Sequence, residues 1–273
     1  MGGFRYFSRW TIGSCVLALL TIAAATHAEA KDDDAGWTVR VGLGGQIRPD
    51  YPGSDDMRVS PYPVISIRKT GDPIPFGAPG DSPGMTLIKT GGLQIGPIAN
   101  LSPKRKAKDV GIPIEKVGTT IEGGAFIQYY LLPAVRIRAE ARKGFGGHKG
   151  WIGSLGSDFI LRDKDRYILS IGPRVRFADH RYQRAYFGIT PATSLASGLP
   201  VFEPDGGIYA VGVNAGALYQ FTYHWGVTGY ARYDRLVHDA ARSPLVRQLG
   251  SRNQYSAGVA LTYTFDIGKL SPR

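Results

Sequence analysis

The sequence predicts an all-β protein, a transmembrane antiparallel up-and-down β-barrel. Residues 255–265 alternate without a break between apolar or aromatic side chains and small or polar ones, which is the period of a β-strand. The same alternation recurs along most of the chain, without helical segments that could cover the apolar faces. The chain also starts like an exported protein. We therefore expect lipid against the apolar faces, in the outer membrane of a Gram-negative bacterium.

The first thirty residues predict a cleaved signal peptide. Two arginines precede an apolar run over residues 11–25, and Ala28-Glu29-Ala30 supplies the small-x-small cleavage pattern. The run falls short of the roughly 20 apolar residues that a membrane-spanning helix needs. We expect residues 1–30 to be removed, so that residues 31–273 form a single barrel domain.

Composition restricts the class of partner. The chain carries 33 Lys and Arg against 22 Asp and Glu, a formal net charge of +11. These basic residues are spread along predicted strands and loops rather than clustered as in a nucleic-acid-binding motif, so lipid phosphates and anionic envelope polymers are the expected counter-charges. The only cysteine, Cys15, lies in the predicted signal peptide, which excludes thiol chemistry from the mature chain.

The first two strands are predicted over residues 37–48 and 58–69. Apolar and polar positions alternate in both, and the loop 49–56, rich in Pro, Gly and Asp, turns the first strand around. Pro61 and Pro63 each lack a backbone donor, so the second strand is expected to be distorted or to lie at a rim.

The next part of the chain gives weaker signals. Residues 73–79 and 84–90 are short candidate strands separated by a Gly-Asp-Ser-Pro-Gly sequence, and 93–101 is a clearer one. The stretch 102–118 contains a run of lysine and arginine and is predicted to be a solvated loop. Counting both weak candidates gives twelve strands, and treating them as one irregular connection gives ten. The alternation at 85–88 favours twelve.

The second half of the chain alternates strongly. Short turns and long connections fall on opposite sides, as expected for periplasmic turns and outer loops, and both termini on the periplasmic side require an even strand number. The predicted strands are 121–131, 135–144, 151–162, 167–178, 209–222, 225–236 and 255–265.

The inward faces of these strands carry charged residues of both signs. One interpretation is a structural network, because charges in a narrow lumen are costly unless they are paired. The other is an anion-selective pore or a site for an acidic solute, because rings of arginine favour anions. The predicted lumen residues are Arg40, Arg48, Glu122, Arg136, Arg138, Glu140, Arg142, Asp158, Arg174, Arg176, Arg232 and Asp234.

Catalytic and metal sites have little support. His238, Asp239 and Ser243 are the residue types of an acyl-transfer site, but an irregular loop fixes no geometry that would join them. Asp55 and Asp56 lack the regular ligand spacing of a calcium site and read as a solvated turn. We therefore predict no catalytic residues, no metal and no cofactor, and a protein that is not an enzyme.

Several loop motifs occur in order over about two hundred residues, among them Tyr51-Pro-Gly-Ser-Asp-Asp56, Ser197-Gly-Leu199 and Asp239-Ala-Ala-Arg-Ser-Pro-Leu245. Together they resemble the MipA/OmpV family over essentially the whole mature chain. The motif residues that carry the resemblance include Tyr51, Gly53, Ser54, Asp55, Asp56, Ser197, Gly198, Ser243, Pro244 and Asn253.

The resemblance implies an outer-membrane protein of the envelope. The founding member is described as a scaffold between a lytic transglycosylase and a murein synthase, and other members as porin-like or adhesive. We therefore expect a monomeric scaffold or binding protein in contact with outer-membrane lipid, with a murein synthase and a lytic transglycosylase as partners and no nucleic acid. The alternative is a narrow porin-like channel with a basic, anion-favouring lumen.

Overall fold

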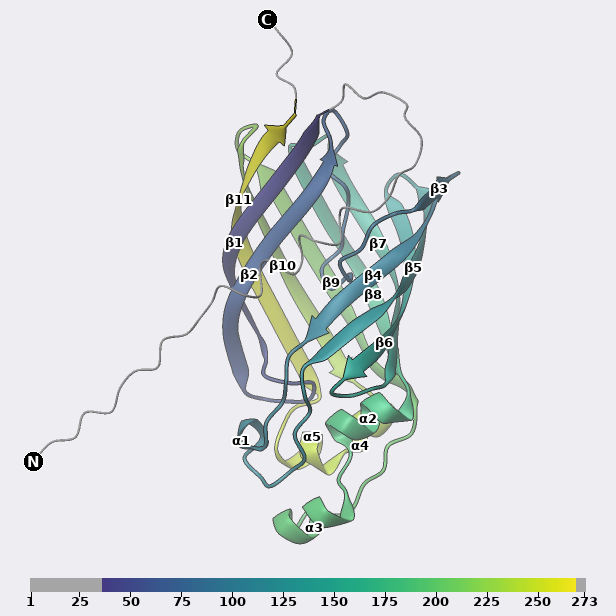
Figure 1. Ribbon diagram of the computed structural model, residues 1–273, viewed down its shortest axis with the longest axis vertical. Helices are drawn as coiled ribbons and strands as arrows, with labels where there is room; N and C mark the ends of the chain where they lie inside the picture. The colour runs from purple at the N-terminus through teal and green to yellow at the C-terminus, as the bar shows by residue number, and fades with distance from the viewer. Residues whose placement is uncertain (1–35, 269–273) are drawn as a thin grey trace, which may run out of the picture. The chain divides into compact units, whose positions relative to one another are not determined.

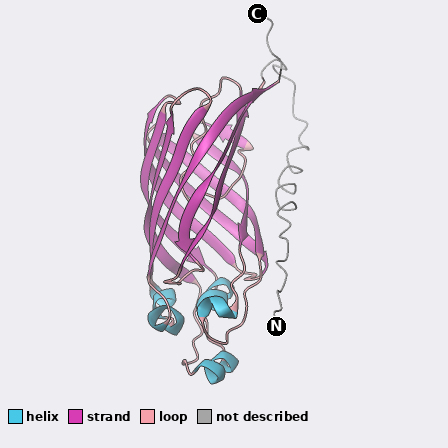
Figure 2. Ribbon diagram, turned by 90° about the vertical axis from the view of Figure 1, so that its left-hand side faces the viewer, coloured by secondary structure: helices cyan, strands magenta, loops and turns pink. Residues whose placement is uncertain are grey.

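The computed structural model describes residues 36–268, which form a β-sheet curled around a central lumen (Figures 1 and 2). The predicted signal peptide and residues 269–273 lie outside the described part of the chain. Within residues 36–268, no helix is long and apolar enough to cross a membrane.

The sheet contains eleven antiparallel strands, and their spatial order is β2-β1-β11-β10-β9-β8-β7-β6-β5-β4-β3. The ten clear strands of the sequence are confirmed, with ends that differ by at most two residues. The bounds are β1 (Trp37–Pro49), β2 (Met57–Lys69), β3 (Ile88–Thr90), β4 (Leu93–Ser102), β5 (Thr120–Leu132), β6 (Val135–Gly146), β7 (Trp151–Asp163), β8 (Tyr167–Ala178), β9 (Gly207–Gln220), β10 (Trp225–Leu236) and β11 (Asn253–Ile267).

The first and last long strands show how the alternation builds the wall. In β11, Ala260, Thr262 and Thr264 are buried on the lumen side, while Leu261 is exposed on the outside. Strand β1 pairs with β11 along its length, and Gly44 lies opposite Ala260. A Cβ at Gly44 would lie 1.8 Å from the Val259 carbonyl oxygen, so this close strand approach requires glycine.

The outer surface is a continuous apolar wall. Large hydrophobic side chains face outward from every long strand of the sheet, a far greater apolar exposure than a soluble monomer tolerates. Aromatic rings lie near both ends of the strands, including Trp37 and the Trp225–Tyr263 pair at one end and Trp151 and the Tyr233–Tyr255 pair at the other. This distribution matches a lipid-facing band between two interfacial girdles.

Five short helices gather at the end of the sheet away from the start of β1 and the end of β11 (Figure 1). They belong to the long connections, and α2, α4 and α5 share a hydrophobic core in which Phe187, Leu236 and Val246 are buried. Asp179 caps one helix by accepting the Tyr182 backbone N–H at 3.0 Å. We call this region the helical cap. The helices are α1 (Ala107–Val110), α2 (His180–Phe187), α3 (Pro191–Ser197), α4 (His238–Arg242) and α5 (Pro244–Gln248).

The predicted count of twelve strands needs a correction between β2 and β4. Residues 73–79 do not join the wall; they run inside the lumen, where Ile74 packs against Ile160, Ile168 and Leu218. Residues 83–90, which include β3, then follow β4 in antiparallel fashion through hydrogen bonds such as Met85 N–H to the Pro97 carbonyl at 3.2 Å. The chain therefore returns through the lumen over residues 73–79, which the sequence analysis counted as a strand of the wall. We call residues 71–82 the lumen segment.

This route leaves β2 at an edge of the sheet. Strand β2 and residues 83–90 both run toward the end with the short turns, so they are parallel, and the ladder contains no pairing between them within residues 36–268. The Thr70 backbone N–H donates to the Gly36 carbonyl in the same register as the β1–β2 ladder. Because hydrogen-bonded pairs alternate along an antiparallel ladder, the even-numbered residues of β2 bond to β1. Pro61 and Pro63 therefore point their nitrogens to the free edge, which lacks donors there.

The lipid-facing assignment can be tested with two leucines. Leu261 is 52% exposed at mid-strand in β11, whereas Leu195 is 91% exposed in the helical cap. Leu261→Arg should cost about 2–4 kcal/mol because the charge would enter the bilayer, while Leu195→Arg should be nearly neutral. Heat-modifiable gel mobility and unfolding in lipid vesicles would measure the difference. Equal tolerance of both variants would mean that β11 does not face lipid.

The two prolines are expected to protect the free edge of β2. Replacing both with valine restores two backbone donors on an extended apolar strand, which favours edge-to-edge pairing. We expect the double variant to assemble and to shift from monomer to dimer in detergent, as measured by light scattering during gel filtration. The matched control, Ile65→Val with Ile67→Val, leaves the donors unchanged and should stay monomeric. An unchanged mass for the proline variant would contradict this role.

Candidate functional site: a charged lumen held by an internal segment

The structure places the predicted charged residues on the inward faces of the strands, and most of them form three connected groups. The first group centres on Asp158, which is fully buried. Its carboxylate accepts Arg136 Nη2 at 2.6 Å and Arg174 Nη2 at 2.6 Å. Arg136 is also fully buried, so this ion pair has little contact with solvent. Such a pair is stable only because its remaining donors are also satisfied.

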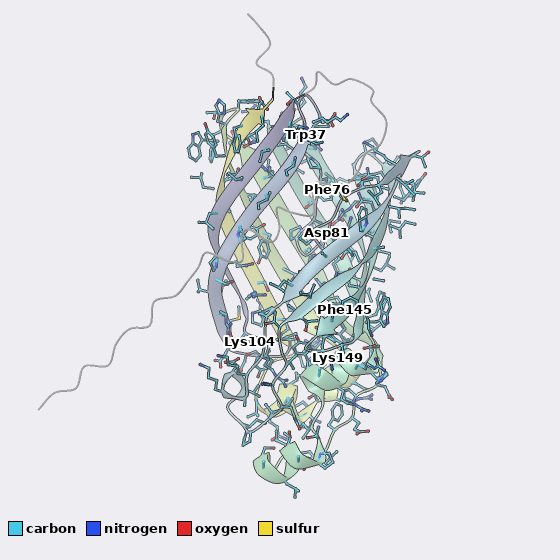
Figure 3. All side chains as sticks on the ribbon, in the orientation of Figure 1. Trp37, Phe76, Asp81, Lys104, Phe145 and Lys149 are labelled. Atoms are coloured by element: carbon cyan, nitrogen blue, oxygen red, sulfur yellow. The ribbon has the colours of Figure 1, made fainter. Side chains whose placement is uncertain are left out.

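The lumen segment supplies an additional carboxylate to this group. Asp81 Oδ2 accepts Arg136 Nη2 at 2.7 Å and lies 3.9 Å from Arg138 Nε. Figure 3 labels Asp81 and Phe76 of this segment. Phe76 of the same segment lies under the Arg136 guanidinium, 4.6 Å from ring centroid to Cζ. The segment thus contacts the arginines through both a charge and an aromatic face.

The second group lies farther toward the helical cap. Glu140 accepts Arg138 Nε at 2.7 Å and Arg142 Nη1 at 2.7 Å, and Ser82 of the lumen segment donates to it from both its backbone N–H and its hydroxyl. Arg142 Nε donates to Glu122 at 2.9 Å. Glu122 therefore continues the network toward the cap.

His148 joins Glu122 to the helical cap. The His148 Nδ1 atom accepts the Gly150 backbone N–H at 3.0 Å, so Nε2 carries the ring proton and donates to Glu122 Oε1 at 3.2 Å. The ring also packs edge-on against Tyr182 of α2. His148 thus links the charged groups of the lumen to the hydrophobic core of the helical cap.

Charge balance explains why the lumen segment lies on this side. Strands β5–β8 direct four arginines of the first two groups into the lumen, against three carboxylates. Asp81 supplies the fourth carboxylate. Each arginine then has a counter-charge, which removes most of the penalty for holding it in a narrow lumen.

The third group and the β1 wall are less compensated. Arg176 and Arg232 share Asp234, at 3.0 and 3.2 Å. Arg40 is buried, and its Nε and Nη1 atoms have no hydrogen-bond partner among residues 36–268. Arg48 Nε is also without a partner in the described chain. The third group, which lies beside Gly80 of the lumen segment, and the β1 wall are therefore more basic than the first two groups.

The sequence analysis did not assign Asp81, Ser82, Gln128 or His148 to the charge network. Asp81 and Ser82 lie in the Gly-Asp-Ser-Pro-Gly sequence, which reads as a turn, and Gln128 bridges Arg136 and Arg138 by accepting from both. The surplus of arginine on the inward faces of β5–β8 was the one available signal that another carboxylate was needed.

The loop motifs have structural roles in the helical cap. Gly53, with a φ of 98°, donates its N–H to Gln254 Oε1 at 2.9 Å, and Gln254 donates to the Ser54 carbonyl at 3.0 Å. Tyr51 is buried in the cap, whereas Asp55 and Asp56 are exposed. These contacts join the first loop to the start of β11.

The remaining motif residues end helices or join strands. Ser197 donates to the Thr193 carbonyl, Gly198 ends α3 with a φ of 76°, and Pro244 starts α5. Asn253 accepts the Tyr233 hydroxyl at 2.9 Å.

The catalytic residue types in the last loop are engaged elsewhere. The Ser243 hydroxyl is buried and donates to the Phe187 carbonyl at 2.7 Å. Asp239 accepts Arg242 and the Asp205 backbone N–H. These contacts fix the cap connection to α2.

Comparison with known proteins identifies the family. A family model described as MltA-interacting protein MipA matches residues 41–265. The chain belongs to the MipA family. This confirms the resemblance seen in the loop motifs, and the apolar outer wall of this MipA-family chain supports a place in the outer membrane.

Other comparisons add little to the family assignment. No curated protein matches the chain. Among solved structures, an outer-membrane channel from Pseudomonas putida F1 is 10% identical, with a TM-score of 0.43, and the match covers 87% of this chain and 100% of that one. OmpT, an outer-membrane protein of Vibrio cholerae, is 10% identical, with a TM-score of 0.35, covering 87% of this chain and 100% of that chain. Similarity at this level carries no argument about function.

The network can be tested by removing one buried carboxylate. Glu140→Ala should lower the free energy of unfolding by about 3–5 kcal/mol, because it leaves two buried arginines under-compensated. The matched control is Glu203→Ala, which removes an exposed partner of Arg184 and should cost no more than about 1 kcal/mol. Urea unfolding in detergent micelles would measure both. Equal effects would mean that water reaches Glu140.

Proposed function

We propose that this chain is a non-enzymatic outer-membrane scaffold whose lumen is closed. The single observation that carries the proposal is the lumen segment, which occupies the interior and is fixed to the wall by charges. A passive channel needs an interior in which charges remain free to meet solutes. In the first two groups the arginines are already neutralised, so they offer little attraction to a passing anion.

The lumen segment is anchored along its length. Ile74 N–H donates to Asp165 Oδ1 at 2.9 Å near the short turns, and the Pro79 carbonyl accepts Asn214 of β9. Asp81 then pairs with Arg136, and Ser82 donates to Glu140, both of β6. These contacts reach several different wall strands, so opening the lumen would break many of them together.

The partner follows from the family. Its description names an interaction with MltA, and the resemblance implies a lytic transglycosylase linked to a murein synthase. A barrel with a closed lumen contributes a fixed membrane position and exposed ends, which is what a scaffold for murein enzymes requires. The scaffold acts as a monomer, after export with a cleaved signal peptide, and needs no cofactor or metal.

A narrow anion-favouring channel is the second candidate. The observation that favours it is the β1 wall, where Arg40 is buried with two unpartnered guanidinium nitrogens. A path along this side would pass arginines that the lumen segment does not neutralise.

Planar-bilayer recording and a binding assay together test the proposal. The purified protein should show no steady conductance and should retain a purified lytic transglycosylase of the MltA type in a biolayer assay. Asp81→Ala should introduce a small leak while leaving binding unchanged, because it removes one of the contacts that hold the lumen segment and does not alter the exposed ends. Steady anion-selective steps in the unmodified protein, or a lack of transglycosylase binding, would overturn the proposal.

A further inference from the structure

The helical cap contains a cavity of about 350 Å³. His148, which joins the cap to the charged lumen groups, is one of its lining residues. Three segments that are distant in sequence form it: the β4–β5 connection, the β6–β7 connection and helix α2. Figure 3 shows Lys149 of the β6–β7 connection at this end of the molecule. The volume is within the range of small-molecule sites.

The lining of the cavity is strongly basic. Five cationic side chains border it, Arg105, Lys116, Lys149, Arg181 and Arg184, and the one carboxylate among the lining residues is Glu115.

The Glu115 carboxylate is occupied at the start of α3. Its two oxygens accept the Thr190 hydroxyl at 2.5 Å and the Thr193 hydroxyl at 2.7 Å. The hydrogen bond from Thr190 in particular holds the pKa of Glu115 below its ordinary value. Within residues 36–268, Arg184 is the one lining cation in an ion pair, with the exposed Glu203 at 3.7 Å, so the five cations outnumber the nearby carboxylates.

Arg105 is the most informative of these residues. It is only 3% exposed, and its guanidinium donates to two backbone carbonyls, Tyr186 at 3.2 Å and Glu115 at 2.8 Å. Its Nε has no hydrogen-bond partner, and it forms no ion pair with a carboxylate within residues 36–268. Burial lowers the pKa of Arg105 from its ordinary value. A buried guanidinium without a counter-charge is unfavourable, and an anion in the cavity would relieve that cost.

The backbone of the cavity also carries a strained residue. Lys149 has a φ of 51°, in the left-handed region that residues other than glycine rarely adopt. Its carbonyl accepts Lys143 Nζ at 2.8 Å, which helps to hold this conformation. Strain at a residue that borders a cavity is typical of a site with a specific geometry.

We propose that this cavity is a binding site for a phosphate group, carried either by a lipid headgroup or by a soluble phosphorylated molecule. Arginine binds phosphate oxygens with its planar donor fork, and lysine contributes a compact point charge. Five cations around one cavity suit a group with more than one negative charge better than a single carboxylate. The site lies in the cap, so it does not depend on whether the lumen conducts.

Binding measurements on cap variants test this site. The variant Arg181→Ala with Arg184→Ala removes two exposed cations of α2, so folding should be retained. The matched control is Arg247→Ala with Arg252→Ala, which removes the same charge from exposed cap positions outside the cavity lining. Calorimetry at physiological salt would use inorganic pyrophosphate as the soluble probe and detergent micelles doped with phosphatidic acid as the lipid probe.

We expect at least a tenfold loss of affinity for the cavity variant and less than a twofold change for the control. Stronger binding of pyrophosphate would assign the site to a soluble molecule, and stronger binding of the doped micelles would assign it to a lipid headgroup. Equal losses in the two variants would show that binding follows net charge alone and would overturn the site. Failure of the unmodified protein to bind either probe would overturn it as well.

Discussion

The ion pairs around Asp158 are the interaction on which the rest of the interior depends. A barrel wall directs every second side chain inward, so arginines on neighbouring strands meet in a narrow space. Asp158 neutralises Arg136 and Arg174, but the wall alone lacks a carboxylate for each arginine. Asp81 completes the balance from the lumen segment. The interior position of that segment is therefore an electrostatic requirement of the wall as well as a consequence of chain connectivity.

The interior pass of the chain has a cost at the edge of the sheet. Because residues 71–82 run through the lumen, β2 has no antiparallel neighbour on the side away from β1 in the described part of the chain. Unpaired backbone donors are expensive in a bilayer and invite association with other strands. Pro61 and Pro63 reduce the number of such donors, and Gln46 donates a side-chain hydrogen bond to the Pro61 carbonyl at 3.0 Å. The chain thus stabilises its edge locally, without a closing strand.

Sequence alone predicted what depends on local alternation. The ten clear strands and the inward positions of residues such as Arg138 and Glu140 follow from the contrast between lipid and lumen. This contrast determines the alternation within each strand separately. The lumen segment was taken for a strand because residues 73–79 are apolar in either location. Pairings such as Arg142 with Glu122 depend on the register between strands, which periodicity does not determine. The cap cavity was missed because two connections and a helix, all distant in sequence, contribute its cations.

The cost of burying an arginine without a counter-charge has opposite consequences in the two charged regions of this molecule, the lumen and the helical cap. In the first two groups of the lumen, each arginine has a carboxylate, so an entering anion would have to displace an existing partner. In the cap, Arg105 has only backbone carbonyls, and the Glu115 carboxylate is bound to two threonine hydroxyls. An anion arriving there gains a charge interaction without breaking one. Recognition of anions is therefore favoured at the cap, while the ion pairs of the first two lumen groups stabilise the barrel wall.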